Sequence, residues 1–71
     1  MAESVYKIIE LVGSSPKSWE DAVNNAVKKA SESLRDLRIC EVVKFDIKIE
    51  GGKIVAYRAR VQLSFKYETA T

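Results

Sequence analysis

The side chains with the most chemical capacity in this sequence are cations that alternate with apolar residues along 57–66. Arg58, Arg60 and Lys66 fall on one side of this segment. Guanidinium and ammonium groups donate hydrogen bonds to anions, so this row could contact carboxylates or the phosphates of a nucleic acid. The opposite row is apolar and indicates the core-facing side of a β-strand: Tyr57, Ala59, Val61, Leu63 and Phe65.

Nucleic-acid binding would require aromatic rings beside these cations, because bases stack on such rings. Tyr57 and Phe65 fall on the other side of the segment. We therefore expect no nucleic acid as a partner. For Arg60 and Lys66 we favour pairing with charges on neighbouring strands or subunits.

Residues for catalysis or metal binding are scarce. The chain has no histidine and one cysteine, Cys40, so the most common acid–base group and the usual zinc ligands are missing. Cys40 falls at an inward strand position with no base and is predicted to be an inert, buried thiol. Glu41, Asp46 and Glu50 form no calcium loop. We read them as solvated acids, with a cation between subunits as the alternative, and predict no catalytic residue, no metal ligand and no enzyme.

One helix must separate the first strand from the other two. Ser18 is a good N-cap, and the apolar positions from Trp19 onward recur at helical spacing. This pattern predicts a helix from about 18 to 35. The strand before it covers 4–12, and 13–18 forms a loop. Because Trp19 begins the apolar stripe, we expect it to belong to the core.

The strand predicted at 38–50 changes phase in its middle. Cys40 and Val42 face inward at even numbers, whereas Val43 and the apolar residues after it do so at odd numbers. One extra residue near Val42–Val43, a β-bulge, would produce this change. The outer face of the strand would then carry Ile39, Glu41, Lys44, Asp46 and Lys48.

Gly51 and Gly52 make the turn into the last strand, predicted at 54–68. We favour a loop of three residues that ends at Lys53, because it keeps the apolar rows of the two strands together. The simplest sheet places the last strand in the middle. The predicted fold class is α+β, a β-α-β-β chain whose three-stranded antiparallel sheet packs on one helix.

The chain has 71 residues, and we expect a single domain over 1–71 with frayed tails at 1–3 and 69–71. A helix of this length is roughly 27 Å long, whereas the last strand could reach roughly 45 Å. The helix cannot cover such a hairpin, and we expect the Leu63–Phe65–Tyr67 end to stay bare. A bare apolar strand favours association with copies of the same chain. The predicted partner is therefore the protein itself, as a homo-oligomer.

The sequence also bears on location. No apolar run approaches the roughly 20 residues that span a bilayer, and we see no signal peptide. A lone thiol fits a reducing compartment. We expect a cytoplasmic protein without a membrane partner, and its net charge of +2 indicates no particular ligand.

Two segments carry a family resemblance, "GSSPKSWEDA" at 13–22 and "LRICEVV" at 37–43. Together with the hairpin that ends in "YRARVQLSF", they resemble the dodecins over residues 4–68. The resemblance implies a hollow spherical homo-dodecamer that binds and stores a small molecule without catalysis. The family ligand is a flavin such as FMN, FAD or riboflavin, held in pairs where subunits meet.

The resemblance assigns two flavin contacts, and both are substituted here. The family has a tryptophan that stacks on the flavin where this chain has Ile39, and a glutamine where it has Arg58. Ile39 and Arg58 are therefore the candidate cofactor-binding positions. Isoleucine offers no stacking surface and arginine only donates hydrogen bonds, so flavin affinity should be reduced or altered. The alternative is a flavin-free shell whose pocket is closed by ion pairs, Arg58 with Asp46 or Glu41 of a neighbour, or holds a metal cation or a phosphate-bearing ligand.

Overall fold

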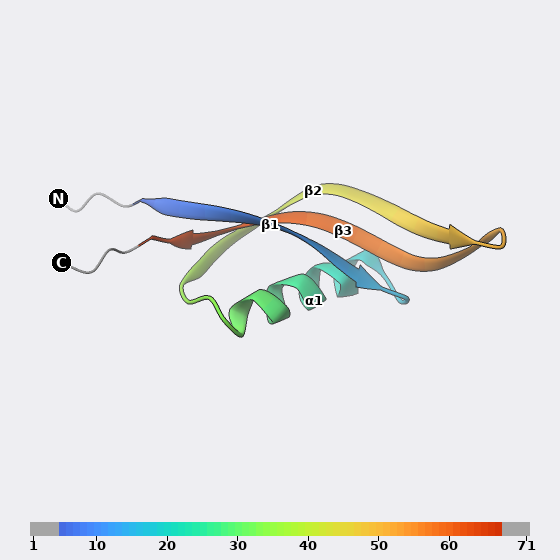
Figure 1. Ribbon diagram of the computed structural model, residues 1–71, viewed down its shortest axis with the longest axis horizontal. Helices are drawn as coiled ribbons and strands as arrows, with labels where there is room; N and C mark the ends of the chain where they lie inside the picture. The colour runs from blue at the N-terminus through green and yellow to red at the C-terminus, as the bar shows by residue number, and fades with distance from the viewer. Residues whose placement is uncertain (1–4, 68–71) are drawn as a thin grey trace.

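The computed structural model describes residues 5–67. Its elements follow the order β1 (Tyr6–Ser15), α1 (Trp19–Ser31), β2 (Leu37–Glu50) and β3 (Lys53–Lys66). The strands form one three-stranded sheet in the order β1-β3-β2, and β3 runs antiparallel to both neighbours (Figure 1). The predicted α+β fold with the last strand at the centre is confirmed. The tails predicted at 1–3 and 69–71 lie outside the described residues.

The helix begins where the sequence predicts but ends earlier. Ser18 is the N-cap, and its side chain accepts a hydrogen bond of 3.0 Å from the backbone N–H of Asp21. The helix ends at Ser31 and not near residue 35. Leu34, which continued the apolar spacing, packs against the core from the turn that follows. The helix is therefore only about 20 Å long.

The core is thin because alanines form the buried side of α1. They meet the inward row of β3, and the buried hydrophobic set is Ala22, Ala26, Ala30, Ala59, Val61 and Leu63. On β1, Gly13 is buried beneath the helix: a Cβ built on it would lie 2.0 Å from the carbonyl oxygen of Ala22. The sequence predicted that the first strand ends before Gly13, and this is wrong. β1 continues to Ser15, and Gly13 serves the close approach of helix and strand.

The β-bulge predicted in β2 is present. Val42 lies opposite Val61 and Lys44 opposite Arg60, so the register shifts by one residue and Val43 has no partner in the ladder. Residues directly opposite in an antiparallel pair share a face. Val42 therefore faces the helix with Val61, while Lys44 lies on the other face with Arg60.

The hairpin turn differs from the prediction. Glu50 lies opposite Lys53, so the turn has two residues, Gly51 and Gly52, with φ of 58° and 76°. Positive φ at both positions is the geometry that glycine adopts most readily and that suits a tight hairpin. The apolar rows still stay together, because a further register shift follows Lys48.

The helix leaves much of the sheet uncovered. In Figure 1, α1 lies beneath the middle of the sheet, and both ends of β3 extend beyond it. The Cα radius of gyration is 14.9 Å, whereas a compact domain of this length has roughly 11 Å. The prediction of a bare Leu63–Phe65–Tyr67 end is wrong for Leu63, which is buried, but is confirmed for Tyr67, which is 48% exposed. The helix-facing side of β2 and the hairpin end are also uncovered, because Phe45, Ile49 and Ile54 are exposed there.

Candidate functional site

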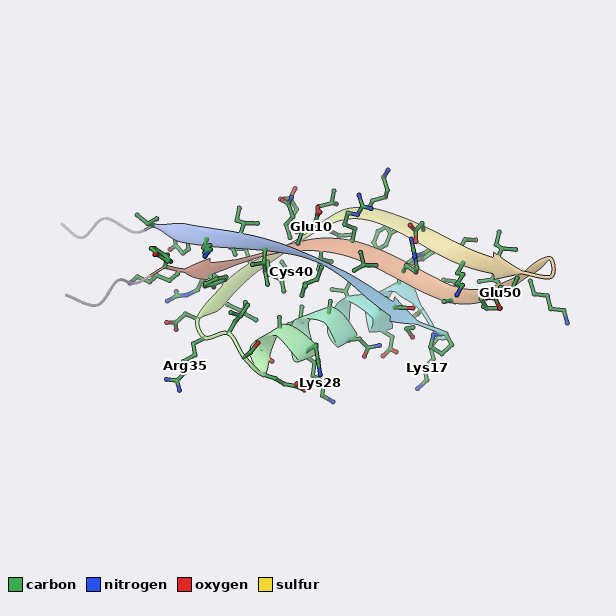
Figure 2. The ribbon with its side chains drawn as sticks, in the orientation of Figure 1. Glu10, Lys17, Lys28, Arg35, Cys40 and Glu50 are labelled. Atoms are coloured by element: carbon green, nitrogen blue, oxygen red, sulfur yellow. The ribbon has the colours of Figure 1, made fainter. Side chains whose placement is uncertain are left out.

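The side of the sheet that faces away from α1, here called the open face, carries the polar row noted in the sequence. The cross-strand register arranges it in rows, each of which takes one residue from β1, β3 and β2. Glu10 marks this face in Figure 2. The rows are Ile8–Ser64–Ile39, Glu10–Gln62–Glu41, Val12–Arg60–Lys44 and Ser14–Arg58–Asp46.

An ion pair occupies the last of these rows. Arg58 donates from Nε to Oδ1 of Asp46 at 2.7 Å and from Nη2 to Oδ2 at 2.9 Å. Both carboxylate oxygens are therefore engaged in the two-point geometry that arginine favours. The sequence pointed to Asp46 of a neighbouring copy as one partner of Arg58. The structure forms this pair within one chain.

The ion pair changes the acidity of Asp46. The hydrogen bond from Arg58 lowers the pKa of the Asp46 carboxyl group, and the charges of Arg60 and Lys44 lower it further. The same hydrogen bond raises the pKa of Arg58. Both groups are thus held in their charged forms.

The other candidate position, Ile39, is exposed on the open face. Its side chain is 66% exposed, and its row contains Ser64 and the similarly exposed Ile8. No aromatic ring lies in this row, so it offers no platform for stacking on a flavin. The rings of Trp19 and Phe45 are on the helix side of the sheet. The Ile39 row, as one chain builds it, offers a flavin no ring on which to stack.

Ile39 and Arg58 do not share a pocket within one chain. They lie on the same face, as the bulge predicted. However, Ile39 is opposite Ser64, and Ser64 is separated from Arg58 by six positions of β3, which is roughly 20 Å. A ligand much shorter than about 20 Å could touch both positions only if they came from different copies of the chain.

Sequence reasoning missed the row between them. Arg60 was expected to pair with a charge on a neighbouring strand or subunit. Within the chain its neighbour on β2 is Lys44 and its neighbour on β1 is Val12, so the sheet itself supplies no such partner. Neither cation forms an ion pair among the described residues. Only the register across the bulge shows that Lys44 and Arg60 are opposite each other.

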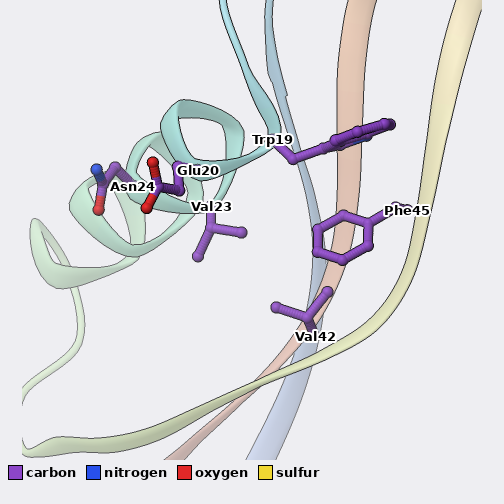
Figure 3. A pocket seen from close by; sticks show the side chains of 6 residues that line it. All are labelled: Trp19, Glu20, Val23, Asn24, Val42 and Phe45. Carbon is purple, nitrogen blue, oxygen red and sulfur yellow. The ribbon is translucent and has the colours of Figure 1, made fainter.

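On the helix side, a groove of about 460 Å³ separates α1 from β2 (Figure 3). Trp19 closes one end of it and contacts Phe45 and Tyr57 at ring-centroid distances of 5.5 and 5.2 Å. The indole Nε1–H donates a 3.0 Å hydrogen bond to the backbone carbonyl of Asp46. Trp19 was predicted to belong to the core. It is 40% exposed and packs on the edge of the core.

Cys40 faces the helix and packs against the core. Burial raises the pKa of its thiol, which keeps it protonated and unreactive at neutral pH. Within residues 5–67, no group of three or more histidine, cysteine or acidic side chains is placed to hold a metal ion. In the same part of the chain, no helix has the length and apolar character to cross a membrane.

Comparisons with known proteins agree with this geometry. The profile of the Dodecin family matches residues 5–68. The calcium dodecin of Mycobacterium tuberculosis is 39% identical over 67 residues, which is 94% of each chain. The dodecin structure from Streptomyces coelicolor superposes with a TM-score of 0.92 at 36% identity and covers 99% of this chain and 100% of its own. A small α+β subunit with an extended hairpin over one short helix is the fold of that family, and the chain belongs to the dodecins.

The crystal structure of the Mycobacterium tuberculosis calcium dodecin superposes with a TM-score of 0.83 at 40% identity. It covers 96% of this chain and 97% of its own, and is described as calcium-chelating with a novel calcium-binding site. The two relatives therefore share the fold of this chain over nearly its whole length.

Proposed function

We propose that this dodecin is a non-enzymatic small-molecule-binding and storage protein that works as a hollow homo-oligomer of twelve subunits. It binds flavin less tightly than a dodecin with tryptophan and glutamine at positions 39 and 58. The observation that carries the proposal is the uncovered apolar side of β2. Phe45 is 52% exposed there and Ile49 60% exposed, and a second copy of the chain is the occupant that removes this surface from water.

Two further features support assembly. The elongated subunit cannot bury this surface by itself, because α1 spans about 20 Å and β3 about 46 Å. The groove beside Trp19 and Val23 continues the same apolar surface onto the helix. Exposed apolar areas of this kind mark association sites in small soluble proteins. We place the protein in the cytoplasm, since its single thiol suits a reducing compartment.

The reduced flavin affinity follows from the two substituted positions. Ile39 presents no ring for stacking, and Arg58 is already held by Asp46. A flavin that contacts both positions would have to displace the Arg58–Asp46 ion pair and would gain no aromatic contact. The second candidate function is therefore a flavin-free shell whose pocket is closed by the Arg58–Asp46 pair.

A calcium-binding role comes from the relative at 39% identity, whose name is calcium dodecin. Calcium takes six to eight oxygen ligands. One chain brings no such group together among its described residues, so a calcium ion would need ligands from several copies. Titration calorimetry with calcium chloride on the assembled protein tests this role, and the absence of a binding isotherm would remove it.

The proposal is tested by mass and by flavin titration. Light scattering after size exclusion should give a mass near twelve times 8.0 kDa, and riboflavin fluorescence should be quenched only weakly. A folded 8.0 kDa species would contradict the proposal, as would a complete lack of small-molecule binding by the oligomer.

A double variant tests the pocket itself. Ile39→Trp with Arg58→Gln should bind riboflavin at least about tenfold more tightly than the parent, since each stacking contact adds roughly 0.5–1.5 kcal/mol. The matched control is Ile8→Trp with Arg58→Gln, because Ile8 is similarly exposed in the same row. Equal gains in the two variants would show that position 39 is not the stacking position.

A further inference from the structure

We propose that Lys44 and Arg60 form a binding site for a phosphate group on the open face of the sheet. The inference rests on the proposed function, because it names the chemical class of ligand that this face holds. The site lies one row from the Arg58–Asp46 pair and is distinct from it.

The bulge in β2 creates the site. If β2 kept its register past Val42, Lys44 would point to the helix side, as Val42 does. The unpaired Val43 reverses the phase and places Lys44 opposite Arg60 on the open face. Both side chains are exposed. Facing residues of neighbouring strands have Cα atoms about 4.5–5.5 Å apart, so both head groups can reach one small anion.

Neither cation is paired with an acid of its own among the described residues. Asp46 is the acid of the adjacent row, but both of its carboxylate oxygens are taken by Arg58. No ion pair of Lys44 or Arg60 is present among the described residues. Like charges directly opposite each other on neighbouring strands destabilise a sheet. An anion that bridges the two groups would remove this repulsion.

The neighbouring rows limit where the anion can lie. On β1 the row ends in Val12, which brings no charge. On one side the next row is the closed ion pair, and on the other side it holds Glu10 and Glu41 with Gln62 between them. The two glutamates repel an anion, so they confine it to the Lys44–Arg60 row. The Gln62 amide can contact an uncharged part of a larger ligand.

A phosphate group suits this row better than a carboxylate. A phosphate monoester carries a charge of about −1.5 to −2 and three acceptor oxygens at neutral pH. Two cations side by side can be neutralised by one such group, whereas one carboxylate would leave a charge uncompensated. Arginine offers a planar fork and lysine a compact ammonium group, and both bind phosphate.

Titration calorimetry of the assembled protein with inorganic phosphate tests the site, in a zwitterionic buffer at low ionic strength. Lys44→Gln with Arg60→Gln should weaken binding at least about tenfold, because each charged hydrogen bond contributes roughly 1.5–3 kcal/mol. The matched control is Lys28→Gln with Lys29→Gln, which removes the same charge from the exposed side of α1 and should leave affinity within about twofold. Circular dichroism verifies that each variant is folded.

A third variant moves affinity in the opposite direction. Asp46→Asn removes the acid that holds Arg58, so a third cation becomes available beside the site and phosphate should bind more tightly. This result cannot come from a damaged fold, which would weaken binding. Equal weakening in the two double variants would overturn the proposal, and so would phosphate affinity unchanged by Lys44→Gln with Arg60→Gln.

FMN and riboflavin distinguish the source of the phosphate, since they share the ring system and differ by one phosphate group. If FMN binds more tightly and the difference disappears in Lys44→Gln with Arg60→Gln, the site holds an organic phosphate. If only inorganic phosphate depends on these residues, the ligand is the free anion. If the oligomer is intact but neither FMN nor inorganic phosphate depends on Lys44 and Arg60, the phosphate site is overturned and the proposed function stands. A folded monomer would overturn the proposed function alone.

Discussion

Replacing Gly13 with alanine should destabilise the protein more than the same replacement at Gly51 or Gly52. The added Cβ would lie 2.0 Å from the carbonyl oxygen of Ala22 and 3.0 Å from the Cβ of Ala26. Ordinary contact between such atoms begins near 3.5 Å, so the helix would have to retreat by more than about 1 Å. The obstructing atom belongs to the helix backbone and cannot rotate away.

The cost can be bounded from the core that the retreat would loosen. Overpacking a well-packed core typically costs about 1–3 kcal/mol, and here the retreat also separates Ala22 and Ala26 from the sheet. We therefore expect a loss of about 3 kcal/mol. A chain of this length has a total stability of roughly 4–11 kcal/mol, so Gly13→Ala would remove a large part of it.

The assay is urea unfolding followed by circular dichroism at a fixed protein concentration, because assembly makes apparent stability depend on concentration. Gly52→Ala is the control. It adds the same methyl group where no atom lies within 4 Å, at a φ of 76°, and should cost about 1–2 kcal/mol from backbone strain alone. If Gly13→Ala proves no more destabilising than Gly52→Ala, the close seating of α1 on β1 is wrong.

Three further predictions concern polar contacts. Ser15→Ala should cost about 1–3 kcal/mol in urea unfolding, because its buried hydroxyl donates to Asp21 at 2.6 Å, whereas Ser14→Ala on the exposed side should be neutral. The lowered pKa of Asp46 means that its ion pair stabilises the fold above about pH 4 and ceases to do so as pH falls through the lowered value. Asp46→Asn should flatten this part of a stability profile measured from pH 6 to pH 2, and an unchanged profile would refute the linkage. Trp19→Phe keeps an aromatic ring but loses the hydrogen bond to the backbone of residue 46, so it should cost about 1 kcal/mol in urea unfolding.

The features that the sequence predicted well depend on local chemistry or on burial. Ser18 caps the helix because its hydroxyl reaches a backbone N–H three residues later, a distance that the sequence itself sets. The bulge at Val43 was visible because no single alternation keeps the apolar residues of both halves of β2 on the buried side. The end of the helix was missed because Leu34 continues the apolar spacing from a turn and still reaches the core.

The features that the sequence did not predict depend on pairing between distant segments. Apolar rows can be aligned by a longer turn or by a second register shift, and alternation alone does not separate these choices. The structure uses the shift after Lys48. Likewise, Ile39 and Arg58 were correctly placed on one face, but the register that separates them along β3 is a long-range property. The same register sets Lys44 opposite Arg60.

The two ends of the described chain leave the sheet together. Tyr6 of β1 lies opposite Lys66 of β3, and Figure 1 shows this end of the sheet remote from the hairpin turn. Segments attached next to Tyr6 and Lys66 would therefore leave the sheet side by side. A short linker could join these two ends of the sheet, and a new opening could be made between Gly51 and Gly52, where no neighbouring atom lies within 4 Å of either Cβ position. The fold is thus suited to circular permutation, which would transfer both attachment points to the hairpin tip.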